Sequence, residues 1–192
     1  MILVEIHDGL FHEHFRIRPT GTENGWRVLT ECDAQPALPL SLEALACVCP
    51  LLREAGELSG QNHFEDFDAL KDEILKRAPG GRAWNEVFDD KSLHDIGEVV
   101  ITRKSGKVER HKLFQFQKRN TLVRVAWAYG NGRKTMLITH MFVKPGGKKT
   151  TPQNEKDRAQ KVLQKYCDAV DTSLVKLIDE QGGRDGFLKL AP

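Results

Sequence analysis

The sequence predicts an α+β fold in which an antiparallel sheet of about four strands, at residues 97–144, is packed with helices. Two observations predict the sheet. Apolar and polar residues alternate within this stretch, and short turn motifs divide it. A third observation predicts the helices. Apolar residues recur three or four positions apart at 152–181, and a similar pattern at 41–78 precedes the sheet.

The start of the chain predicts an N-terminal β extension at residues 1–34. Short segments there are rich in β-branched and aromatic residues, and turns containing glycine separate them. We expect residues 35–181 to form the main domain. Residues 182–192 are expected to be a flexible tail, because Gly182 and Gly183 end the last predicted helix.

The helical stretch before the sheet contains its own boundaries. Ser41 is a suitable cap, but Pro50 lies inside the apolar pattern, so we expect either a kink or two short helices. A further helix is predicted at 64–77, where a Pro-Gly-Gly sequence at 79–81 ends it.

The last strands and the last helix also have clear boundary residues. Gly-Asn-Gly at 130–132 predicts a hairpin turn, because Gly and Asn tolerate positive φ. Thr151 is a suitable helix cap, with Pro152 in the first helical position, where a missing N–H has no cost.

Composition sets limits on the class of protein. Of the 192 residues, 40% are hydrophobic and 29% are charged, which is ordinary for a soluble globular protein. No apolar run approaches the roughly 20 residues that span a bilayer. The first residues include charges at Glu5 and Asp8, which argues against a secretory signal. We therefore expect a cytoplasmic protein that is not associated with a membrane.

The four cysteines, Cys32, Cys47, Cys49 and Cys167, show no CxxC spacing. Since Cys47 and Cys49 lie in an apolar stretch, we interpret them as small buried residues, with a thiol or metal site as the alternative. The sequence predicts no metal and no cofactor.

Charge is distributed very unevenly along the chain. Residues 1–102 carry 9 basic and 19 acidic side chains, whereas residues 103–149 carry 13 basic side chains and only Glu109 as an acid. The second segment thus has a net charge of +12, which is expected to attract phosphates or an acidic partner. The alternative is a solvated face whose charge is offset by acids packed nearby.

The strand–turn–strand at the end of the predicted sheet has a distinctive order. An apolar strand at 124–129 starts with arginine, and the next ends in an apolar run followed by His140, an aromatic residue and lysine. The chain continues through Lys-Lys-Thr-Thr-Pro at 148–152 into a helix. This combination, over 108–168, resembles the RelE/HigB superfamily of small bacterial toxins, especially its phage-related HigB-like branch.

The resemblance implies a RelE-like sheet and the toxin component of a type II toxin–antitoxin system. It implies a ribosome-dependent mRNA endonuclease, with a cognate antitoxin, mRNA and the ribosome as partners. Cleavage by a ribose 2′-OH needs cations at the phosphate and a group that moves protons. The matching catalytic residues are Arg124, for phosphate stabilisation, and His140, for acid–base or base-stacking work. The candidates for RNA and phosphate binding are Arg110, Lys112, Lys144, Lys148 and Lys149.

Each catalytic candidate also has a purely structural interpretation. Arg124 is alternatively the partner of an acid from the N-terminal half, and His140 a satisfied sheet histidine. Gln115 and Gln117 stand where family members often carry Glu and Arg. Glutamine forms hydrogen bonds but does not stabilise charge as arginine does, so this departure weakens the nuclease prediction.

Two other functions therefore remain open. One is a non-nuclease toxin that blocks DNA replication by binding gyrase or the sliding clamp. Gln61, Phe64 and Phe67 faintly resemble a clamp-binding peptide, although two core phenylalanines at the start of a helix explain them as well. The other is a nucleic-acid-binding or host-interaction protein that does not inhibit growth.

Overall fold

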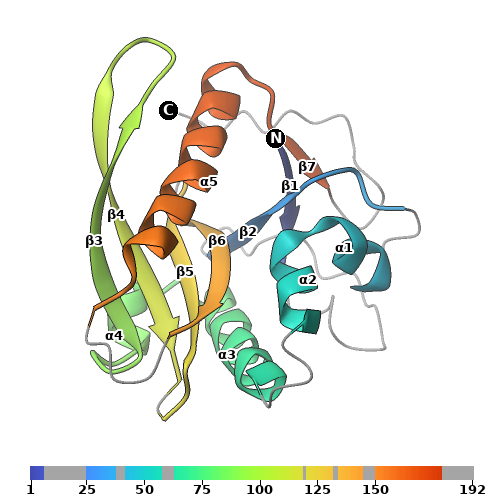
Figure 1. Ribbon diagram of the computed structural model, residues 1–192, viewed down its shortest axis with the longest axis vertical. Helices are drawn as coiled ribbons and strands as arrows, with labels where there is room; N and C mark the ends of the chain where they lie inside the picture. Colours follow the sequence, from blue (N-terminus) through green and yellow to red (C-terminus); the bar gives the residue numbers. More distant parts are fainter. Residues whose placement is uncertain are drawn as a thin grey trace.

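The structure is a computed structural model that describes residues 1–6, 25–37, 42–57, 63–118, 120–131, 134–144 and 150–178. These residues form a seven-stranded sheet with helices on both faces (Figure 1). The strands are β1 (Ile2–Glu5), β2 (Arg27–Cys32), β3 (Leu93–Thr102), β4 (Val108–Gln117), β5 (Val123–Tyr129), β6 (Thr135–Val143) and β7 (Lys176–Ile178). The helices are α1 (Leu42–Val48), α2 (Pro50–Glu57), α3 (His63–Arg77), α4 (Trp84–Val87) and α5 (Gln153–Asp171), with a 3-10 turn at Ala78–Gly80.

The sheet is mixed and has the order β3-β4-β5-β6-β2-β1-β7. The four strands β3 to β6 form an antiparallel meander. Strand β2 then pairs in parallel with β6, β1 pairs antiparallel with β2, and β7 pairs in parallel with β1. The first strands of the chain, β1 and β2, therefore belong to the same sheet as the meander.

The prediction of a RelE-like antiparallel sheet of about four strands is wrong for this reason. The meander exists, but β6 is an interior strand of a seven-stranded mixed sheet and not an edge. Its residues Thr135 to Phe142 are all buried. A strand buried on both faces is mostly apolar, and the Met136–Phe142 stretch is apolar except at Thr139 and His140. A four-stranded sheet would have left this strand unpaired along one side.

Each face of the sheet carries its own core. On one face, α5 packs Leu163 and Tyr166 against Leu29, Leu113 and Leu137 of the strands. Figure 1 shows α5 lying across this face. On the other face, α1 to α4 pack against the strands around three large residues, Phe67, Trp84 and Trp127. Burial of both faces explains why the central strands β5 and β6 are almost wholly buried.

One predicted helix boundary is confirmed and another is wrong. The break at Pro50 is confirmed as two short helices, because α1 ends at Val48 and α2 begins with Pro50 itself. The last helix was predicted to reach residue 181 but ends at Asp171. Ser173 follows in a left-handed conformation, with φ of 55°, and the chain then forms β7 beside β1. The predicted tail at 182–192 lies outside the described residues.

None of the helices in the described part of the chain has the length and apolar character needed to cross a membrane.

Candidate functional site

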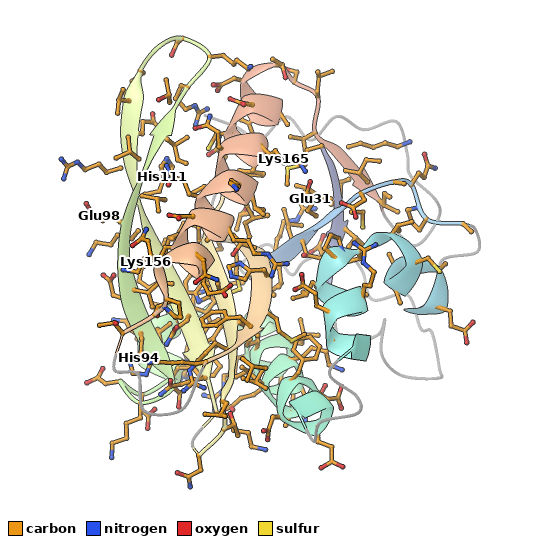
Figure 2. All side chains as sticks on the ribbon, viewed as in Figure 1. Glu31, His94, Glu98, His111, Lys156 and Lys165 are labelled. Carbon is orange, nitrogen blue, oxygen red and sulfur yellow. The ribbon has the colours of Figure 1, made fainter. Side chains whose placement is uncertain are left out.

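Acidic neighbours offset much of the positive charge on the β3–β4 hairpin. Arg103 pairs with Asp171 of α5, Lys112 lies 3.4 Å from Asp95, and Arg110 lies 3.9 Å from Glu98. Glu98 lies on the outer side of the hairpin in Figure 2. These residues therefore match the second alternative from the sequence, a solvated face whose charge is offset by nearby acids.

The predicted phosphate-binding residues of β4 lie on the opposite face from the predicted catalytic pair. Strand residues alternate between faces. Lys112 is next to Leu113, which faces α5, so Arg110 and Lys112 point to the other side of the sheet. Arg124 and His140 share the α5 side, because Arg124 is paired with Gln117 and His140 with Ala126. The structure therefore separates the two predicted sets.

Three further basic residues gather elsewhere, at the end of the sheet where α5 begins. Lys118 follows β4, Arg124 is the second residue of β5 and Lys144 follows β6. We call this region, defined by Lys118, Arg124 and Lys144, the basic end. The Lys144 N–H donates to Leu122 O across 2.8 Å, which holds β6 beside the start of β5. Three more basic residues adjoin it in the sequence but lie outside the described residues: Arg119, Lys148 and Lys149.

Arg124 is the unusual member of the basic end, because its guanidinium is buried and no carboxylate of the described residues pairs with it. The side chain is 8% exposed. One terminal nitrogen donates to Thr121 O at 2.7 Å and Val123 O at 2.8 Å, while Nε has no partner among the described residues. No carboxylate pairs with Arg124 in the described part of the chain, so the predicted alternative of an ion pair is not found there. Burial lowers the pKa of Arg124, yet guanidinium stays charged at neutral pH. An uncompensated buried cation is costly and favours a bound anion.

His140 lies on the same face and is 1% exposed. Its Nδ1 is 3.0 Å from the Thr139 hydroxyl, which donates its own hydrogen to Ala126 O. Thr139 therefore accepts a hydrogen bond from Nδ1–H, which leaves Nε2 without a proton in neutral imidazole. Nε2 faces a Glu155 carboxylate oxygen at 3.2 Å. Burial lowers the pKa of His140 to about 4, and the Glu155 carboxylate opposes that shift.

A row of paired residues that ends at His140 crosses four strands of the sheet. His94 of β3, Gln115 of β4, Ala126 of β5 and His140 of β6 are consecutive register partners. Arg124 is diagonal to His140, since it opposes Phe142, and diagonal positions are roughly 7–8 Å apart. Together, Gln115, Arg124 and His140 surround the small side chain of Ala126 beneath the start of α5.

The start of α5 completes this group with two residues that the sequence did not assign to the site. The Thr151 hydroxyl donates to Gln115 Oε1 at 3.0 Å, and Glu155 faces His140. Thr151 was predicted to cap α5, but the N-cap is Pro152 and makes no side-chain cap bond. Lys156 of α5, labelled in Figure 2, places its Nζ beside Gly97 of β3. The periodicity of a helix shows which residues face a sheet, but not which strand residues they meet.

Of the three predicted partner-binding residues, one lies in the core and two lie, wholly or in their side chain, outside the described residues. Phe67 is 4% exposed and packs in the core on the α3 side, as the core interpretation requires. Gln61 and the side chain of Phe64 lie outside the described residues. Within the described ranges, no three His, Cys, Asp or Glu side chains gather as a metal site would require.

No family model, no curated protein and no solved structure matches this chain. The residues themselves offer two chemical capacities. Arg124 can bind an anion through its buried cation, and His140 Nε2, which lies 3.2 Å from the Glu155 carboxylate, can accept a proton.

Proposed function

We propose that this chain binds RNA at the basic end of its sheet, with a phosphate group as the ligand of Arg124. The observation that supports this most strongly is the buried guanidinium of Arg124, which has no carboxylate partner in the described part of the chain. Planar guanidinium binds phosphate oxygens through paired donors. Lys118 is exposed and has no ion pair among the described residues, so it can extend the contact along the backbone of the nucleic acid.

The chemistry that fits this ligand is the metal-independent RNA cleavage that the resemblance implies. A 2′-OH would attack the adjacent phosphorus, the P–O5′ bond would break, and the leaving O5′ would take a proton from water. The proton of the 2′-OH would pass to His140 Nε2, and Arg124 would stabilise the charged phosphate. Because His140 is 1% exposed beneath α5, this step requires the first turn of α5 to move. Growth inhibition as a toxin neutralised by an antitoxin is the biological role that goes with this proposal.

Binding to a single-stranded RNA oligonucleotide tests the first part. Arg124→Gln is expected to weaken binding roughly 10- to 100-fold, since a hydrogen bond to a charged group contributes about 1.5–3 kcal/mol. It should also reduce the slope of log affinity against log salt by about 1. The matched control is Lys112→Gln, which removes a charge from the opposite face and should leave affinity nearly unchanged. Equal weakening by both substitutions would show that only overall charge matters.

Induced expression in a bacterium tests the second part, with wild type compared with Arg124→Ala/His140→Ala. Protein and DNA synthesis are labelled separately. Early failure of translation, with a harmless double variant, is the result expected of an RNA-cleaving toxin. Early failure of DNA synthesis, with the double variant still toxic, would instead favour the replication-protein binder predicted from Gln61, Phe64 and Phe67. Absence of any growth defect would leave RNA binding without toxicity.

A further inference from the structure

Two cysteines far apart in the sequence meet where β2 ends and α2 begins. The Asp33 N–H donates to the Val48 carbonyl across 2.7 Å. Cys32 directly precedes Asp33, and Cys49 directly follows Val48. The two cysteines therefore adjoin a pair of residues joined by a backbone hydrogen bond, so their backbones are close neighbours, as a disulfide with Cα atoms about 4.4–6.8 Å apart requires.

The two sulfur atoms are also in hydrogen-bonding contact, and their surroundings make them unequal. The Cys32 thiol hydrogen-bonds to Cys49, which raises the pKa of Cys32 and lowers that of Cys49. Cys49 precedes the first residue of α2, and the Leu51 and Leu52 N–H groups donate to its sulfur. Burial acts against the thiolate at both positions, where exposure is 3% for Cys32 and 0% for Cys49. Donors at a helix start make Cys49 the better nucleophile of the pair.

The other two cysteines provide contrast. Cys47 is exposed, and Cys167 is buried in the separate core beneath α5. Burial raises the pKa of Cys167 to about 11. Cys32 and Cys49 both belong to the core on the α1–α4 side of the sheet. The prediction that Cys47 and Cys49 are both buried is therefore right for Cys49 only.

We propose that Cys32 and Cys49 form an oxidation site, at which a small hydroperoxide converts the two thiols into an intramolecular disulfide. The Cys49 sulfur attacks a peroxide oxygen, the O–O bond breaks and Cys49 becomes a sulfenic acid. The Cys32 sulfur then attacks the Cys49 sulfur, so that the S–S bond forms and the S–O bond breaks. Each step releases one water molecule when the peroxide is hydrogen peroxide, and the two thiols lose two electrons and two protons. The burial of both sulfurs favours a small oxidant over a bulky disulfide.

The Cys47→Ser variant tests this proposal, because it removes the exposed thiol and leaves three. The folded variant is treated with hydrogen peroxide, then denatured and alkylated. We expect Cys167 alone to be alkylated and peptide mapping to find Cys32 joined to Cys49 in a bond that dithiothreitol reverses. In Cys32→Ala/Cys47→Ser, Cys49 should stop at the sulfenic acid and react with a dimedone probe.

Three results would overturn the proposal. Cys32 and Cys49 could remain alkylatable after a treatment that fully oxidises Cys47 of the wild type. The disulfide could form only after unfolding in urea. Cys167 could lose its thiol as fast as Cys49. Cys47→Ser/Cys167→Ala serves as the matched control, since it should form the same disulfide at an unchanged rate.

Discussion

Trp127→Ala is expected to lower the free energy of unfolding by about 3–5 kcal/mol, the usual cost of emptying a large aromatic site in a core. Trp127 is 0% exposed and lies on central strand β5. Its ring stacks on Phe114, with centroids 4.7 Å apart, and on Phe116 at 5.4 Å, while Trp84 meets it edge-on. Removing it opens a cavity between the sheet and the helices on the α3 side. Urea denaturation followed by circular dichroism measures the loss.

Two substitutions control for this result. Trp127→Phe keeps a ring in the stack, and it also removes an indole N–H that has no partner among the described residues, so the loss should be much smaller. Tyr129→Ala, two positions along the same strand, affects a side chain that is 46% exposed, and we expect a loss of no more than about 1 kcal/mol. Similar losses for Trp127→Ala and Tyr129→Ala would mean that the aromatic stack is not the centre of this core.

The antiparallel meander was predictable from local pattern, whereas the full sheet was not. Alternation and turn residues act between neighbours in the sequence, and they identified β3 to β6. The parallel pairing of β2 with β6 joins Arg27–Thr30 to Thr135–Ile138, more than a hundred residues away. Only the mostly apolar sequence of β6 indicated that this strand has neighbours on both sides. The resemblance to a RelE-like sheet predicted the smaller number of strands.

The candidate site was predictable in part for a related reason. Arg124 and His140 were singled out from the sequence, and the structure places them on one face. Their spacing depends on a register shift between Ala126 and Trp127, which leaves Thr139 as an additional residue beside His140. Such a shift has no clear signal in an apolar strand. The contact with Glu155 depends in turn on how α5 crosses the sheet, and so on packing over the whole face.

Stability is expected to fall as the pH drops from about 6.5 to about 4, because His140 is buried in its neutral form. The unfolded chain binds a proton at His140 near the ordinary pKa of 6.5, whereas the folded chain binds it only near pH 4. Between these values the unfolded state holds more protons, so acid favours unfolding. The contribution of His140 is therefore complete above pH 6.5 and is lost towards pH 4, by about 3 kcal/mol in all.

Urea denaturation of wild type and His140→Gln across this pH range isolates the contribution, because glutamine does not titrate and the other groups are shared. The free energy of unfolding of the wild type should fall relative to that of His140→Gln as the solution becomes more acidic. The opposite trend, with the advantage of histidine lost as the pH rises, would mean that Glu155 holds His140 as an imidazolium in the folded protein. That outcome would also reverse its role in the proposed cleavage. A neutral imidazole that becomes accessible when α5 moves can accept the proton of a 2′-OH, whereas an imidazolium can only donate one to the leaving oxygen.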